Sequence, residues 1–188
     1  MKTLTTPRHI RGLIFLILYI GSIVLSNLFI DWFGIVPVGF GMQAPAAVWV
    51  IGFTMTLRDL TQDQLGIPPV FVGIVAGALV SALFSPQLAL ASGAAFLFSE
   101  VSDLLVYTPI RLRGHLYLSV VASNTVGTVL DTCVFLWLAF GSLSMAGGQI
   151  WGKMVGTLFC VLALRLIHGR SPARLPAYKR AQLSQPVG

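Results

Sequence analysis

The sequence predicts an all-α integral membrane protein with six transmembrane helices and both termini in the cytoplasm. Hydrophobic residues make up 56% of the 188-residue chain and charged residues only 10%, and the mean hydropathy is +0.86. Several apolar runs approach the roughly 20 residues that a helix needs to cross a bilayer. Most basic residues lie beside and between these runs. This composition excludes a soluble globular domain.

The first two spans are expected at residues 12–33 and 45–60. The first is longer than the apolar core of a cleaved signal peptide and lacks a small-residue cleavage pattern after it, so we expect a retained helix. The glycine-rich segment between them, residues 34–41, is predicted to be a loop or a re-entrant turn. Pro45 can begin the second helix because a proline in the first turn forfeits no internal hydrogen bond.

The remaining spans follow the same punctuation. They are expected at residues 69–84, 88–107, 117–140 and 149–168, and Pro109 is expected to end the helix over 88–107. Residues 1–168 therefore form one six-helix domain. The third and sixth spans each carry small residues four positions apart, a spacing that predicts close helix packing: Gly73, Gly77 and Ser81, and Gly148, Gly152 and Gly156.

The distribution of basic residues predicts the topology. The loops at 34–44, 85–87 and 141–148 contain no Lys or Arg, so we expect them outside and the basic segments inside, next to anionic membrane lipids. The net charge of +6 is accounted for by these flanks, and no nucleic-acid partner is expected. Residues 169–188 are basic and lack a core pattern, which predicts a disordered cytoplasmic tail.

No motif indicates a cofactor, a metal site or a catalytic centre. Cys133 and Cys160 lie in apolar spans without the spacing of metal ligands, and the histidines fall in flanks, at His9, His115 and His168. We therefore expect no enzyme. An intramembrane enzyme that uses its acids as general acid and base stays a rival hypothesis.

Carboxylates inside apolar spans point to function. A carboxylate near the bilayer centre costs about 2.5 to 3.5 kcal/mol on insertion scales, so such groups are rarely without a role. Glu100, Asp103 and Tyr107 share one helix face. Nine residues are candidates for substrate binding, namely Asn27, Asp59, Gln62, Glu100, Asp103, Tyr107, Asn124, Asp131 and Lys153.

For several of these candidates a structural role is an equal alternative. Asn27 could make a helix–helix hydrogen bond, and Arg58 beside Asp59 could be an ordinary ion pair at the membrane interface. Antiparallel packing of the fifth and sixth spans would place Asp131 and Lys153 at comparable depth, where each can neutralise the other. Lys153 could instead extend to the outer surface.

Four stretches resemble the queuosine precursor transporter family, also called the vitamin uptake transporter family. They are FTMTLRDLTQDQLG, FLFSEVSDLLVYTPIRLRG, SNTVGTVLDTCVFLWLAFG and GKMVG, within residues 50–165. The resemblance implies a six-helix fold related to the vitamin-binding S-components of energy-coupling transporters. It also implies import of 7-deazaguanine precursors of queuosine across a bacterial inner membrane. Residues at positions where that family keeps polar or small residues are Asp59, Glu100, Asp103, Ser123, Gly127, Asp131 and Lys153.

The chemistry of a guanine-like base fits this expectation. Its adjacent N–H donors can both be accepted by one carboxylate, for which Glu100 and Asp131 are candidates. The predicted function is a transporter that moves a purine-like small molecule through a polar site at the membrane midplane. The alternative is a binding subunit for a vitamin or nucleobase that needs a coupling partner. A homodimer is also left open.

Overall fold

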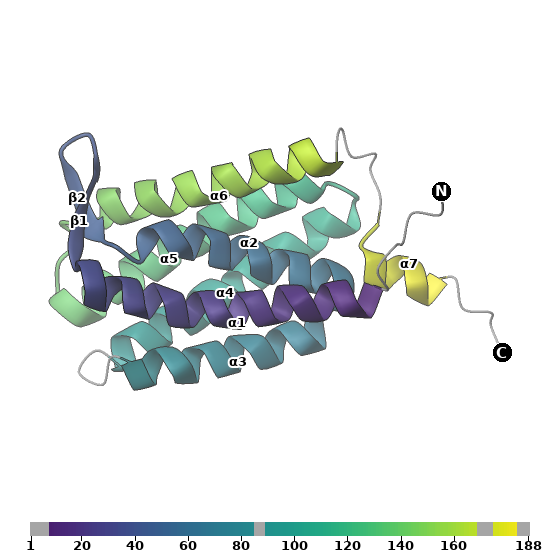
Figure 1. Ribbon diagram of the computed structural model, residues 1–188, viewed down its shortest axis with the longest axis horizontal. Helices are drawn as coiled ribbons and strands as arrows, with labels where there is room; N and C mark the ends of the chain where they lie inside the picture. Colours follow the sequence, from purple (N-terminus) through teal and green to yellow (C-terminus); the bar gives the residue numbers. More distant parts are fainter. Residues whose placement is uncertain (1–7, 85–88, 169–174, 184–188) are drawn as a thin grey trace.

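Six long helices form an elongated bundle in the computed structural model, which describes residues 8–84, 89–168 and 175–183 (Figure 1). The described ends of the chain lie together at one end of the bundle, and a β-hairpin lies at the other. The helices are α1 Arg8–Phe33, α2 Val48–Leu65, α3 Ile67–Phe84, α4 Ala89–Leu112, α5 Leu116–Phe140, α6 Ala146–His168 and the short α7 Ala177–Leu183. Each of the six predicted ranges overlaps one of the long helices.

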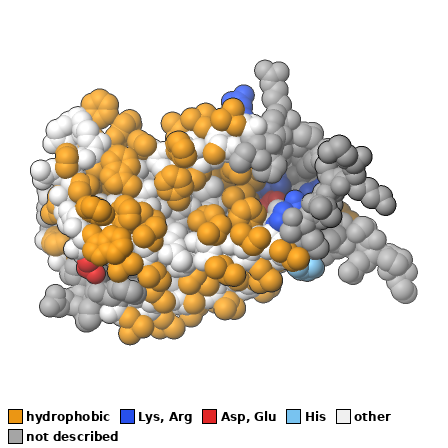
Figure 2. All heavy atoms as spheres, in the orientation of Figure 1, with side chains coloured by type: hydrophobic (Ala, Val, Ile, Leu, Met, Phe, Trp, Pro, Cys, Tyr) orange, Lys and Arg blue, Asp and Glu red, His pale blue; other side chains and the backbone are white. Residues whose placement is uncertain are grey.

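Polar residues lie inside the bundle and apolar residues outside. Arg58 is completely buried, whereas 86% of Leu166 is exposed. Figure 2 shows hydrophobic side chains along the length of the bundle, with Lys and Arg side chains mostly toward the end where α7 lies. A water-soluble protein has the opposite arrangement, so the apolar outer surface is suited to lipid.

Three of the described helices have the length and hydropathy of membrane spans: α1, α5 and residues Ala146–Leu166 of α6. Residues Ile67–Gly77 of α3 form a shorter apolar helix. Charged residues inside α2 and α4 lower the hydropathy of those helices. An all-α membrane protein agrees with these helices, and the six-span topology stays a prediction.

The segment after α1 is a β-hairpin, not the expected loop or re-entrant turn. Strand β1, Ile35–Gly39, pairs antiparallel with β2, Met42–Pro45. The turn between them has positive φ at Gly39, Phe40 and Gly41, which two glycines make accessible. The prediction that Pro45 begins a helix was therefore wrong, because Pro45 pairs with Ile35 at the end of β2 and α2 starts three residues later.

Glycines bring α2 and α6 into backbone contact. A Cβ added at Gly52 would lie 2.3 Å from the carbonyl oxygen of Lys153, and one added at Gly156 would lie 3.1 Å from the Cα of Gly52. At Gly148 an added Cβ would lie 2.3 Å from the carbonyl oxygen of Gln43 in the hairpin. The predicted close packing of this stripe of small residues is confirmed, and it places Lys153 directly against α2.

Helix α4 also departs from its predicted end. It continues through Pro109 to Leu112, where an end at residue 107 was predicted. An ion pair between Arg111 Nη2 and Asp63 Oδ1, 2.6 Å long, ties this last turn to α2. This tertiary contact compensates for the hydrogen bond that Pro109 cannot donate.

The predicted disordered tail contains a helix. Helix α7 packs against the end of α2, where the Tyr178 ring lies over Gly66, and Arg8 Nη1 donates a 3.4 Å hydrogen bond to the carbonyl of Ala177. The expectation of disorder is therefore corrected for residues 177–183. Residues 169–174 and 184–188 lie outside the described part of the chain.

Candidate functional site

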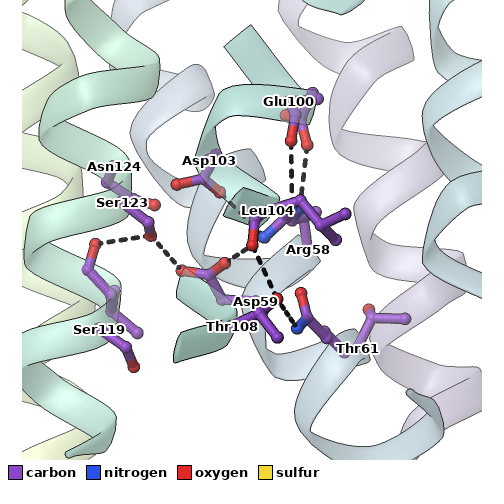
Figure 3. Close-up of polar contacts among 12 residues, drawn as sticks. Arg58, Asp59, Thr61, Glu100, Asp103, Leu104, Thr108, Ser119, Ser123 and Asn124 are labelled. Carbon is purple, nitrogen blue, oxygen red and sulfur yellow. Dashed lines mark hydrogen bonds and ion pairs between the residues drawn. The ribbon is translucent and has the colours of Figure 1, made fainter. Parts of the chain in front are cut away.

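A buried arginine with three carboxylates occupies the middle of the bundle (Figure 3). Arg58 Nη1 lies 2.8 Å from Asp59 Oδ1 and 3.1 Å from Asp103 Oδ2, and its Nε lies 3.3 Å from Glu100 Oε2. None of the four side chains is more than 2% exposed. We call these four residues, Arg58, Asp59, Glu100 and Asp103, the arginine cluster.

Helices α2 and α4 supply the four residues of the arginine cluster, and α5 contributes a hydrogen bond to it. Glu100 and Asp103 lie one turn apart on the face of α4 that meets α2, and Arg58 Nη2 also donates a 3.0 Å hydrogen bond to the backbone carbonyl of Glu100. From α5, the Ser123 hydroxyl donates a 3.3 Å hydrogen bond to Asp59 Oδ2. Asp59 is thus partnered through both oxygens, and Nη1 and Nη2 of Arg58 each donate a hydrogen bond, whereas Nε makes only the ion pair with Glu100.

A second buried charge pair joins α5 and α6. Lys153 Nζ forms an ion pair with Asp131 and donates hydrogen bonds to Thr132 Oγ1 at 3.0 Å and Gln149 Oε1 at 3.3 Å. Only 1% of the lysine side chain is exposed, so it does not extend to the outer surface. We call Asp131, Lys153, Thr132 and Gln149 the lysine cluster.

The two clusters face one cavity. The cavity has a volume of about 90 Å³, and residues of five helices line it. Glu100 of the arginine cluster and Asp131, Lys153 and Gln149 of the lysine cluster contribute polar atoms to its wall. The remaining wall is polar at Ser26, Asn27, Thr54 and Ser99 and apolar at residues that include Ile23, Met55, Phe96 and Phe135.

Polar atoms at this cavity remain available to a bound molecule. Within the described part of the chain, Gln149 Nε2 and Glu100 Oε2 are buried and make no hydrogen bond, although Oε2 also lies 3.3 Å from Arg58 Nε in an ion pair. One is a donor and the other an acceptor. Since unsatisfied buried polar atoms are costly, this arrangement favours a ligand with complementary donors and acceptors.

Four of the nine predicted site residues line the cavity: Asn27, Glu100, Asp131 and Lys153. Asn27 also donates a 2.9 Å hydrogen bond to the carbonyl of Ile23 in its own helix. Asp59 and Asp103 belong to the arginine cluster behind Glu100.

The other three predicted residues lie apart from the cavity. Asn124 Nδ2 donates to Thr56 Oγ1 at 3.2 Å and to Thr157 Oγ1 at 3.0 Å, which ties α5 to α2 and α6. Gln62 Nε2 donates to Thr108 Oγ1 at 2.9 Å. Tyr107 is buried in an apolar cluster with Val120 and Val161.

Sequence reasoning missed the central position of Arg58, together with Gln149 and Phe135. A signal for Arg58 was present: most Lys and Arg residues lie in flanks or connectors, and Arg58 and Lys153 are the two with interior positions. Since buried carboxylates require a cationic partner, these two residues were the candidates to supply it.

A family model described as "Putative vitamin uptake transporter" matches residues 12–169, which is most of the chain and includes both clusters. The chain belongs to the vitamin uptake transporter family. A Bacillus subtilis (strain 168) protein named "Probable queuosine precursor transporter" is 34% identical to it over 133 residues. That match covers 66% of this chain and 57% of the relative. No solved structure matches the chain.

The resemblance to this family that the sequence predicted is thereby confirmed. The match supports a transporter class, and the apolar helices agree with a multi-pass membrane protein. The matched residues include both clusters and the cavity between them.

Proposed function

We propose that this vitamin uptake transporter imports a queuosine precursor, 7-cyano- or 7-aminomethyl-7-deazaguanine, across a bacterial inner membrane. The cavity between the arginine and lysine clusters is the proposed binding site. The observation that carries the proposal is the position of Glu100: its carboxylate is 2% exposed and lines the cavity, and its Oε2 accepts no hydrogen bond beyond the 3.3 Å ion pair with Arg58. The name of the Bacillus subtilis relative supports the choice of substrate.

The cavity supplies groups that suit a guanine-like base. The Glu100 carboxylate can accept the ring N–H and the exocyclic amine together, in a charge-assisted pair of hydrogen bonds. The amide nitrogen of Gln149 can donate to the carbonyl oxygen of the base. Phe96 and Phe135 offer apolar surface to its flat faces.

The proposed topology has six spans, with α7 and the start of α1 in the cytoplasm and the hairpin outside. The basic flanks at the α7 end and the Lys- and Arg-free hairpin at the other end support this orientation. The site then lies near the membrane midplane. Assembly as a homodimer is a further part of the proposal, which mass photometry of the protein in nanodiscs would measure.

Uptake by the purified protein in liposomes tests this function. We expect both deazaguanines to stabilise the protein against heat in detergent and to be exchanged across the liposome membrane, with adenine inert in both assays. Binding without exchange would favour the alternative of a subunit that needs a coupling partner. A folded protein that binds neither deazaguanine would contradict the proposed substrate.

A further inference from the structure

The arginine cluster has an unbalanced charge. It holds three carboxylates, Asp59, Glu100 and Asp103, and one guanidinium, so full ionisation would leave two negative charges in a site that is at most 2% exposed. The lysine cluster cannot offset them, because Lys153 is already paired with Asp131. Burying net charge in a medium of low dielectric constant is strongly unfavourable.

The contacts indicate which carboxylates are left uncompensated. Asp59 has the most complete set of partners, because Arg58 donates a hydrogen bond to one oxygen and the Ser123 hydroxyl donates to the other. Asp103 and Glu100 also lie within ion-pair distance of Arg58, at 3.1 Å and 3.3 Å, but within the described residues no hydrogen bond reaches either oxygen of Asp103 or Oε2 of Glu100. One guanidinium is therefore shared among three carboxylates, and Glu100 and Asp103 are the two that have the fewest hydrogen bonds to stabilise a negative charge.

A second, independent observation comes from α1. The Tyr19 side chain is completely buried, and its hydroxyl lies beside Glu100 without the geometry of a hydrogen bond. A phenol is another group that can donate or accept a proton. The charged and titratable groups around Glu100 are thus Tyr19 from α1, Arg58 and Asp59 from α2, Asp103 from α4 and Asp131 from α5.

A proton fits this site better than a metal ion. A guanidinium already occupies the centre of the carboxylates, and among the described residues no group of three His, Cys, Asp or Glu is placed to hold a metal. A metal ion would need those oxygens to converge on itself instead. A proton requires only one carboxyl oxygen.

We propose that Glu100 and Asp103 share at least one proton at neutral pH and that this proton couples transport to the proton gradient. The coupling rests on the function proposed above. A guanine-like base needs ionised Glu100, so its arrival moves the proton from the Glu100 oxygen to Asp103, one turn further along α4. The loaded site then carries one substrate and one proton, and the two cross together.

Infrared spectroscopy tests the shared proton without any substrate. At pH 7 the wild-type protein should show the carbonyl band of a protonated carboxyl, which shifts in D2O and disappears on strong alkalisation. The double variant Glu100→Gln with Asp103→Asn should lose this band, whereas Asp31→Asn, at an exposed carboxylate, should keep it. The absence of the band in the wild type, or its persistence in the double variant, would overturn the proposal. If the double variant does not fold, the wild-type pH titration decides alone.

Transport in liposomes tests the coupling. An acidic exterior should raise the initial uptake of 7-aminomethyl-7-deazaguanine several-fold over exchange without a gradient in the wild type. In the Asp103→Asn variant, uptake with an acidic exterior should about equal the variant's own exchange without a gradient. Normal exchange with no stimulation in the wild type would overturn the coupling but leave the proposed function intact. Failure of exchange itself would overturn the proposed function and the coupling with it, while the infrared band would still decide whether the proton is held.

Discussion

Lys153 on α6 and Asp131 on α5 form an ion pair whose lysine is 1% exposed and whose other hydrogen bonds go to Thr132 and Gln149. The pair lines the same cavity as Glu100. Its position follows from the glycines around it, since Gly52 of α2 meets the backbone of Lys153. A buried pair of this kind neutralises two charges that have lost their hydration by water.

Removing the lysine alone is expected to destabilise the protein. Lys153→Met strands the Asp131 carboxylate, which should cost about 3 to 5 kcal/mol. Lys153→Met combined with Asp131→Asn should be at least as stable as the single variant, because no unpaired charge remains. Thermal unfolding in detergent measures both, and Lys179→Met on α7 provides a matched control. Additive, independent effects of the two substitutions would contradict the pair.

Close contact between α2 and α6 predicts a second result. Gly52→Ala introduces a Cβ that would lie 2.3 Å from the Lys153 carbonyl oxygen, so the helices must separate, at a cost of about 1 to 3 kcal/mol. Gly21→Ala on α1 is the matched control, because no atom lies within 4 Å of its added Cβ. The control should be neutral or stabilised by about 0.5 to 1 kcal/mol through helix propensity. Equal melting temperatures for the two variants would exclude the close approach.

The proposed topology predicts opposite labelling of two exposed positions. In a background with Cys133 and Cys160 replaced by Ala, a cysteine substituted for Ser144, between α5 and α6, should react with an impermeant maleimide in intact cells. A cysteine substituted for His115, between α4 and α5, should react only after the membrane is permeabilised. The reverse pattern would overturn the orientation. Labelling of both positions in intact cells would mean that α5 does not cross the membrane, which would contradict the six-span topology.

Much of the bundle could be predicted from the sequence because its signals are local. Span length and apolar composition locate the long helices. Glycines four residues apart predict where backbones meet, and Gly156 of such a stripe meets the backbone of Gly52 on α2. The short connection between α5 and α6 limits the relative depth of Asp131 and Lys153, which made their pairing predictable. These inferences require only neighbouring residues or one short loop.

The rest depends on contacts between distant segments. The hairpin is stabilised by Val38 and Ala44 packing with Val48, which no local pattern indicated. Helix α7 depends on the Tyr178 ring meeting Gly66, more than one hundred residues away in sequence. For Arg58 the sequence leaves an ordinary interfacial ion pair open, because its neighbour Asp59 offers a sufficient partner. Only the packing of α4 against α2 brings Glu100 and Asp103 to it.

The last prediction concerns Glu100 as the residue that recognises the base. Glu100→Gln preserves size and shape but replaces one acceptor by a donor, which would oppose a donor of the guanine edge. Loss of a buried charge-assisted bond together with this mismatch should cost about 2 to 4 kcal/mol, or roughly thirty- to several-hundredfold in affinity. Calorimetric titration with both deazaguanines measures the loss of affinity, and the Asp31→Asn variant should bind like the wild type.

The melting temperature of Glu100→Gln without ligand separates weaker binding from misfolding. Removing surplus negative charge should keep that variant as stable as the wild type. Unchanged affinity in a folded Glu100→Gln protein would remove Glu100 from the binding site.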